Sequence, residues 1–278
     1  MKKIFFVILS VLILCSCGAE PVKENTIYTT FYAMYDFAKE IAGDKMEITE
    51  LVPSGSGPHD FEPTAADVAK ITKSKALIYC GSVDIYVDGI KETAEKAGVQ
   101  TLDTADGITL DGTDPHIWLS PDNALKQYTA IADFLCKIDN ANSAYYKQRL
   151  EAVTEKINEL KKTSEEITAY AAKKDIIVSH AAYSYLCKYL DITEHSLESG
   201  DGGDPTAKQM AEMISYANEN DIHYIFAEKG ESDKTAAAIA KETGAEVEYL
   251  NPLETDTGSG GYFEVMKMNL ELIYNAVK

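Results

Sequence analysis

Three of the five histidines in this 278-residue chain stand in loops or turns, each after a segment with a strand pattern. His59 and His116 follow the second and fourth such segments, and His180 ends the first one of the second half. Taken singly, a histidine in such a place is usually structural, but three at comparable positions are better explained by convergence on one point. Neutral imidazole nitrogens are ligands for zinc, copper, nickel and iron. The pattern therefore predicts a metal site built from distant parts of the chain.

A carboxylate would complete a four-coordinate site around three imidazoles. Glu228 and Glu254 stand at equivalent strand ends in the second half of the chain. Three histidines and one carboxylate form a closed set, whereas a catalytic zinc keeps one position open for water. The donor set therefore favours a protein that holds a metal over an enzyme that uses one.

The other candidate metal ligands are interpreted as structural or solvated. His223 starts a strand pattern, and His195 lies on an irregular run beside acidic residues. Glu198, Asp201 and Asp204 form an acidic, glycine-rich cluster that lacks the register of an EF-hand calcium loop. We expect a solvated loop there.

The element that must hold the two halves together is the stretch 142–174, which contains no glycine or proline. Its apolar residues recur every three or four positions, with one gap around Ser164, and predict one long amphipathic helix of roughly 45 Å. These residues are Tyr146, Leu150, Val153, Ile157, Leu160, Ile167 and Tyr170. Asn142 or Ser143 is expected to cap its start. We interpret it as a rigid strut between two lobes, since a coiled-coil seam would need several sustained heptads.

Strand and helix patterns alternate on both sides of this stretch, which predicts an α/β protein with two Rossmann-like lobes. The expected organisation is an N-terminal lobe over 26–141, the connecting helix over 142–174 and a C-terminal lobe over 175–278. Parallel sheets covered by helices bind ligands beyond the carboxyl ends of their strands. The three histidines and both candidate carboxylates, Glu228 and Glu254, lie in such places.

Several element boundaries carry recognisable signals. Thr64, with Asp67 three residues later, predicts a capping box, and Asp204-Pro205 predicts the N-cap and first turn of another helix. Gly43 is expected to end the first helix, and the first strand is expected to run over 26–32.

The first residues have the pattern of an export signal. Two lysines precede an apolar run that is too short to span a bilayer. That run ends in Leu14-Cys15-Ser16-Cys17-Gly18, which resembles a bacterial lipobox. The resemblance implies a signal peptide over 1–16, a lipid-modified Cys17 and a tether over 17–25. A plain secretory signal is the alternative.

Composition narrows the possible partners. Apolar residues make up 45% and charged residues 26%, as in ordinary globular proteins. The net charge of −19 argues against nucleic acid as a partner and against attraction to anionic lipids. We expect a monomer whose contact with the membrane comes from the lipid anchor.

Three further cysteines, Cys80, Cys136 and Cys187, form no C-x-x-C pair. Buried free thiols are the expected state, with a bridge between Cys136 and Cys187 as the alternative.

Three segments resemble motifs of the substrate-binding proteins of zinc and manganese ATP-binding-cassette importers. They are 53–64 (PSGSGPHDFEPT), 114–121 (DPHIWLSP) and 251–254 (NPLE), and the likeness extends over nearly the whole chain and its long helix. In that family one helix bridges two lobes and the metal lies between them. The resemblance carries two metal ligands over to His59 and His116. The third ligand is histidine in zinc-type members, and here it is His180.

The resemblance implies Glu254 as the fourth ligand, with Asn251 or a water in its place as the alternative. Many zinc-type members also carry a histidine-rich loop before the second motif, but the corresponding segment 104–113 contains no histidine. The implied function is capture of Zn(II) outside the cytoplasm and its delivery to a membrane permease of the importer.

Three other functions remain open at the level of sequence. A manganese-specific protein of the same family would use the same lobes for Mn(II). A secreted zinc hydrolase would use Glu254 or Glu62 as a base, but the chain has no H-E-x-x-H or G-x-S-x-G motif. An adhesin would bind a surface without metal.

Overall fold

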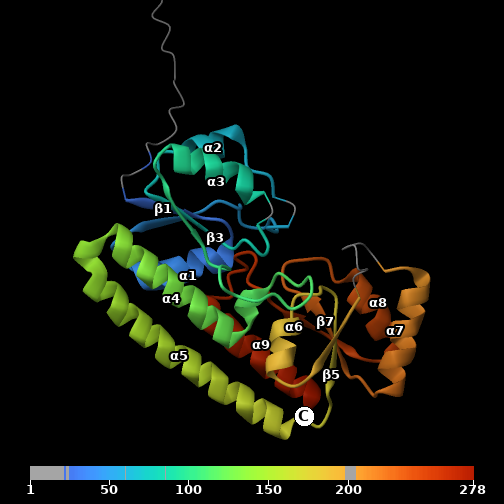
Figure 1. Cartoon of the computed structure of the whole chain (residues 1–278). Coiled ribbons are helices and arrows are strands. Elements are labelled where there is room, and N and C mark those ends of the chain that lie inside the picture. Colours follow the sequence, from blue (N-terminus) through green and yellow to red (C-terminus); the bar gives the residue numbers. More distant parts are fainter. Residues whose placement is uncertain (1–21, 23–24, 60, 85, 198–204) are drawn as a thin grey trace, which may run out of the picture.

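The computed structural model describes residues 22, 25–59, 61–84, 86–197 and 205–278 of the chain (Figure 1). The predicted signal peptide, Cys17 and most of the predicted tether lie outside these residues, as does the whole acidic loop 198–204. Within the described part of the chain, no helix is long and apolar enough to cross a membrane.

The N-terminal lobe is a four-stranded parallel sheet in the order β2-β1-β3-β4. Its strands are β1 (Thr26–Thr29), β2 (Glu47–Glu50), β3 (Ala76–Tyr79) and β4 (Gln100–Asp103). Its helices are α1 (Tyr32–Ala42), α2 (Ala65–Ile71), α3 (Val87–Lys96), the short η1 (Ile117–Leu119) and α4 (Pro121–Ile138).

The C-terminal lobe repeats this plan, with a four-stranded parallel sheet in the order β6-β5-β7-β8. Its strands are β5 (Asp175–Val178), β6 (Thr193–Ser196), β7 (Tyr224–Glu228) and β8 (Glu246–Leu250). Its helices are α6 (Ser184–Tyr189), α7 (Ala207–Glu219), α8 (Lys234–Thr243) and α9 (Tyr262–Val277). The predicted fold class, two α/β lobes with parallel sheets, is confirmed.

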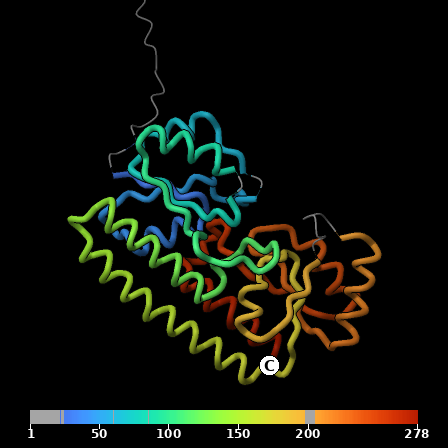
Figure 2. The backbone as a smooth tube through the Cα atoms, in the orientation of Figure 1, coloured from blue at the N-terminus to red at the C-terminus, as the bar shows by residue number. Residues whose placement is uncertain are grey.

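The long helix α5 (Ser143–Tyr170) links the lobes and runs along both of them (Figure 2). Most of the predicted apolar stripe is buried, and Ser164 occupies the gap in it. The Ser164 side chain is fully buried. Its hydroxyl is satisfied within the helix itself, because it donates to the Leu160 carbonyl, 2.9 Å away. Tyr170 was expected on the stripe, but this is wrong: it is 72% exposed.

The helix ends at Tyr170 and does not continue to Lys174 as predicted. Beyond it the backbone N–H groups of Ala172 and Lys173 donate to the carbonyl oxygen of Val277, at 2.7 and 2.9 Å. These two hydrogen bonds replace the helical ones and satisfy the Val277 carbonyl at the end of α9. At the start of α5, the Asn142 side chain makes no cap hydrogen bond.

One hydrophobic core passes through both lobes. It joins one face of each sheet to α1, α4, α5 and α9, with residues such as Ile27, Tyr146, Ile157, Ile176 and Leu270. Separate smaller clusters fill the opposite face of each sheet, under α2 and α3 in one lobe and under α7 and α8 in the other. Figure 1 shows α4 and α5 below the N-terminal lobe, with α9 beside the C-terminal lobe. The two lobes therefore share one core.

The local signals are partly confirmed. The capping box of Thr64 and Asp67 is present, and Gly43, with φ of 56°, follows the end of α1. The start predicted at Asp204-Pro205 is wrong, because Thr206 caps α7 through a capping box with Gln209.

The first strand also stops earlier than expected, at Thr29, because α1 begins at Tyr32. The Tyr32 backbone N–H donates to the carbonyl oxygen of Glu254, 3.3 Å away.

Cys80, Cys136 and Cys187 are free thiols, so the alternative of a Cys136–Cys187 bridge is not realised. Cys80 and Cys187 are buried as expected, and Cys136 is half-buried. Burial raises the pKa of the Cys80 thiol to about 12.

Candidate metal centre

The four predicted ligands all lie beyond the carboxyl ends of parallel strands. His59 stands in the loop between β2 and α2, and His116 immediately precedes η1. His180 follows β5, and Glu254 follows β8. Each lobe therefore contributes two of the four side chains, and the strand ends of both sheets face the same point.

The structure brings one ligand atom of each of these four residues within 4.8 Å of the others. The centre of the group is Oε1 of Glu254. It lies 2.9 Å from Nε2 of His116, 3.1 Å from Nε2 of His59 and 3.5 Å from Nε2 of His180. The Nε2 atom of His116 is 3.3 Å from that of His59 and 3.2 Å from that of His180. Three imidazole edges thus face one carboxylate oxygen.

Exposure of the four side chains is graded. The side chains of His116 and Glu254 are 3% and 5% exposed, that of His180 is 18% exposed, and that of His59 is 37% exposed. The group is therefore closed on the side of His116 and open to solvent on the side of His59.

The electrostatics of the site match its contacts. Burial on its own would raise the pKa of the Glu254 carboxyl, but hydrogen bonds from the three histidines hold it well below its usual value. Burial on its own would lower the pKa of His116, but Asp114 and Glu254 raise it above the usual value. Glu254 is therefore an anion throughout the neutral range, as a metal ligand must be.

Asp114 orients His116, and the sequence prediction did not include it. Its Oδ1 atom lies 2.6 Å from Nδ1 of His116 and also accepts the backbone N–H of His116 at 2.9 Å. A carboxylate on the second imidazole nitrogen fixes the tautomer and aims the first nitrogen. The signal was present in the motif, because Asp114 stands two positions before the histidine.

The turn that presents Glu254 is tied to both lobes. The Trp118 indole N–H donates to the carbonyl of Pro252 at 2.7 Å. The side-chain oxygen of Asn251 accepts the backbone N–H of Leu253 at 2.8 Å, and its amide donates to Thr257 at 2.9 Å. The alternative ligand Asn251 is thus engaged in shaping the turn, and Glu254 is the residue that reaches the histidines.

Glu228, the other carboxylate at a strand end, lies behind His180. Its Oε2 atom is 3.7 Å from Nδ1 of His180. Burial and the nearby charge of Glu254 raise the pKa of Glu228 to about 8. Glu228 therefore borders the site on the side away from the shared carboxylate oxygen.

The remaining two histidines lie apart from this group, as predicted. His195 was expected on an irregular run, but this is wrong: it lies on strand β6. His223 is exposed and lies 3.3 Å from Asp221. The Nε2 atom of His195 is 2.7 Å from Oδ1 of Asp175, and the Tyr216 hydroxyl donates to the same oxygen at 2.7 Å.

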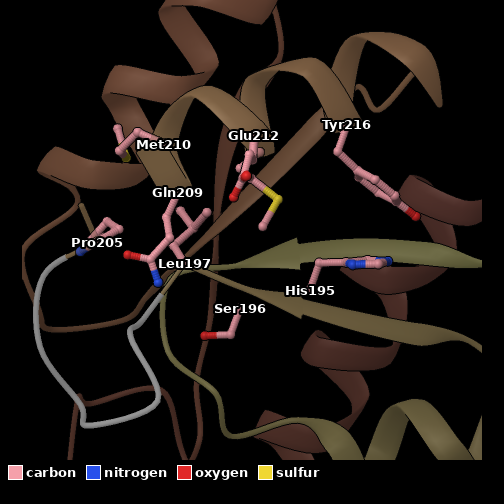
Figure 3. A pocket seen from close by; sticks show the side chains of 9 residues that line it. His195, Ser196, Leu197, Pro205, Gln209, Met210, Glu212 and Tyr216 are labelled. Atoms are coloured by element: carbon pink, nitrogen blue, oxygen red, sulfur yellow. The ribbon is translucent and has the colours of Figure 1, made fainter. Parts of the chain in front are cut away.

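His195 also borders a pocket of about 240 Å³ beside α7, in which Met210, Leu197 and Pro205 are among the lining residues (Figure 3). Figure 3 shows His195 lying along its strand, apart from Met210 and Glu212 on α7. Apolar side chains form much of the lining, so this pocket is a different kind of place from the histidine cluster.

Comparison with known proteins identifies the family. A family model described as "ZnuA: Zinc-uptake complex component A periplasmic" matches residues 27–276. The chain belongs to this family. Membership of the ZnuA family confirms the resemblance read from the three motifs. It also confirms the expectation of a binding protein rather than an enzyme.

Curated relatives in the ZnuA family cover nearly all of this chain. The zinc-binding lipoprotein AdcA of Streptococcus pneumoniae is 31% identical over 98% of this chain. The high-affinity zinc uptake system protein ZnuA of Bacillus subtilis is 29% identical over 99% of it. The chain spans 60% of the length of that AdcA and 97% of that ZnuA.

Solved structures of other proteins share the fold. The Zn(II)-bound ZnuA-like domain of Streptococcus pneumoniae AdcA matches with a TM-score of 0.82 at 31% identity, over 92% of this chain and 99% of that one. The laminin-binding protein Lmb of Streptococcus agalactiae, described as having adhesin and metal-transporting activity, matches with a TM-score of 0.83 at 29% identity, over 91% and 99%.

Proposed function

We propose that this protein captures one Zn(II) ion between its lobes and delivers it to the membrane permease of an ATP-binding-cassette importer. The ligands are His59, His116, His180 and Glu254. The observation that carries the proposal is the approach of three Nε2 atoms, from both lobes, to one oxygen of Glu254.

Zinc suits this donor set. Three imidazoles and one carboxylate give four ligands, the usual number for a zinc ion held by protein side chains alone. A site for Mn(II) or Mg(II) is typically richer in oxygen ligands. The zinc-binding relatives and the zinc-bound domain of similar fold support the same cargo.

The arrangement of side chains in the site suits metal capture better than hydrolysis. Glu254 lies at the centre of the group, so it is a ligand and is not free to activate a water molecule. Glu62, the other base that a hydrolase would use, is exposed and is not part of the group of four.

Entry of the ion is expected from the side of His59. His116 and Glu254 are buried and already held by neighbouring groups, whereas His59 sits on a loop and is the most exposed of the four. Since one core runs through both lobes, wide hinge closure would break buried contacts. Adjustment of the loop around His59 is therefore the motion that admits and releases zinc.

Delivery requires the protein to stay near the membrane. The description of the family as a zinc-uptake complex component supports a permease partner, and a curated relative is a lipoprotein. We propose that Cys17 carries the lipid, on the grounds of its lipobox-like sequence. A single acyl chain anchors a protein only marginally, so stable attachment requires more than one chain.

Calorimetric titration of the wild-type protein and His180→Ala with zinc, and with manganese in parallel, tests the proposal. We expect one zinc bound per wild-type chain, much weaker binding of manganese, and a loss of zinc affinity of at least about 100-fold in the variant, since a ligand is removed. Equal zinc affinity in the two proteins would remove His180 from the site, and a preference for manganese would overturn the cargo.

A further inference from the structure

The segment that carries His116 is held by a helix of the opposite lobe. The backbone N–H of Asp111 donates to the Tyr185 hydroxyl at 2.8 Å, and that hydroxyl lies 3.3 Å from the carbonyl oxygen of Asp114. Lys188 forms an ion pair with Asp111 at 2.7 Å. Figure 1 shows this green segment beside α6. The N-terminal lobe therefore presents His116 on a loop that α6 supports.

One of these contacts reaches the carboxylate that orients the ligand. The hydroxyl of Ser184, the first residue of α6, donates to Oδ2 of Asp114. The other oxygen of the same carboxylate, Oδ1, accepts from His116. A continuous chain of hydrogen bonds thus runs from Ser184 in one lobe, through Asp114, to His116 in the other.

The donors and acceptors in this series of hydrogen bonds are fixed by the Asp114 carboxylate. A carboxylate oxygen can only accept, so the Nδ1 atom of His116 carries a proton in its contact with Asp114. Nε2 is the nitrogen turned toward Glu254, where a bound metal would replace its proton. A hydroxyl on Oδ2 fixes the plane of the carboxylate and so the plane of the imidazole. Such outer partners of a ligating histidine typically change metal affinity by 10–100-fold when they are removed.

We propose that Ser184 is a positioning residue for metal capture, which holds Asp114 from the opposite lobe so that His116 is aimed before the ion arrives. The inference rests on the proposed function, since it concerns the same four ligands. It adds that the two lobes contribute to the site twice, through the ligands and through this support of His116.

The neighbouring contacts have different roles. Both side chains of the Lys188–Asp111 pair are largely exposed, so that pair contributes little. The Tyr185 hydroxyl is hydrogen-bonded to backbone groups of the loop, at Asp111 and Asp114. Ser184, from the other lobe, hydrogen-bonds the Asp114 carboxylate itself.

The test compares Ser184→Ala with Ser184→Thr, which keeps the hydroxyl. The matched control is Ser82→Ala, because the Ser82 hydroxyl donates to the carbonyl of Pro115 at 2.7 Å, in the same loop but within its own lobe. Zinc affinity is measured by competition with a chromophoric chelator. The imidazole N–H signal of His116 is followed by NMR in the metal-free proteins.

We expect Ser184→Ala to weaken zinc binding by roughly 10–100-fold. In this variant the Nδ1 proton of His116 should exchange faster with water. The zinc affinities of Ser184→Thr and Ser82→Ala should stay within about threefold of the wild type. If Ser184→Ala behaves as the wild type in both measurements, or if Ser82→Ala loses as much affinity, the positioning role is overturned while the proposed function stands.

A wild-type protein that fails to bind zinc would overturn the proposed function itself, and the NMR comparison would still show whether Ser184 holds the imidazole. If Ser184→Ala does not fold, the pair Ser184→Gly and Ser184→Thr takes its place. In that pair only the threonine variant keeps the hydroxyl, and equal zinc affinity of the two would contradict the proposal.

Discussion

The Oε1 atom of Glu254 lies 2.9 Å from Nε2 of His116, although 138 positions separate the two residues and they belong to opposite lobes. Both side chains are almost fully buried. A buried carboxylate that faces three imidazoles needs either protons on those rings or a cation among them. The contact therefore explains both how the lobes are held at the site and why the site prefers a metal ion.

Replacement of Glu254 by glutamine keeps its size and removes its charge. We expect Glu254→Gln to bind zinc at least about 100-fold more weakly, because a neutral amide is a poor ligand and the histidines lose their counter-charge. Isothermal titration gives the affinity. The matched control is Glu228→Gln, which we expect to change affinity by less than about tenfold, since Glu228 lies behind His180. Equal losses in the two variants would contradict the assignment of Glu254 as the ligand.

Zinc affinity should fall as the pH falls. Metal and proton compete for Nε2 of each histidine, and the pKa of His116 is above its usual value because Asp114 and Glu254 outweigh the opposite effect of burial. The Glu254 pKa is held well below its usual value by the histidines, so this carboxylate stays charged. We expect a loss of more than roughly tenfold between about pH 7.5 and about pH 5.5 in competition titrations. A flat profile would exclude histidine ligation.

Stability should depend on the buried Asp84, which is remote from the four ligands in the chain. Burial raises its pKa from 3.8 to about 7, so in the folded protein ionisation is costly. With the folded-state pKa above the unfolded one, stability falls as the pH rises from about 4 to about 7. The full difference corresponds to roughly 4 kcal/mol, an upper bound.

Asp84→Asn removes this penalty and can still accept the Cys80 backbone N–H that Asp84 accepts at 2.9 Å. We expect the variant to gain more stability over the wild type at about pH 8 than at about pH 5, by denaturant unfolding. The exposed Asp88 provides the control variant Asp88→Asn, with little effect at either pH. An equal gain at both pH values would contradict the interpretation.

The long helix α5 contributes buried side chains to the core that both lobes share, so a cavity in it should destabilise the whole protein. Ile157 is fully buried in the cluster that spans them, so Ile157→Ala should cost about 2–5 kcal/mol of unfolding free energy. Unfolding should remain a single transition, because the lobes share one core. Asn158→Ala, at an exposed neighbouring position, should change stability by less than about 0.5 kcal/mol. Two separate transitions in calorimetry would show that the lobes fold independently.

The sequence contained enough to predict the fold and the residues that meet. Strand and helix patterns follow local periodicity, and the rule that ligands lie beyond the carboxyl ends of parallel strands selects His59, His116 and His180. That rule leaves Glu228 and Glu254 equally eligible as the carboxylate, and the choice of Glu254 comes from the resemblance of the 251–254 motif. Loop and strand patterns place these residues without any knowledge of contacts between the lobes.

What could not be predicted depends on contacts between distant segments. The helix ends at Tyr170 because Val277, at the far end of the chain, accepts the next N–H groups. Likewise, Ser184 of the other lobe donates to Asp114, and Asp114 in turn accepts from His116. Local periodicity carries no information about such pairs, since each partner lies in a segment that looks ordinary by itself.

X-ray absorption at the zinc edge, on wild-type protein loaded with one equivalent of zinc, tests most directly whether both lobes grip one ion through the four residues. We predict a four-coordinate shell of three nitrogens and one oxygen at about 2.0–2.2 Å, and the loss of one nitrogen scatterer in His180→Ala. A shell that contains sulfur at about 2.3 Å, or one dominated by six oxygens and unchanged in the variant, would contradict the account.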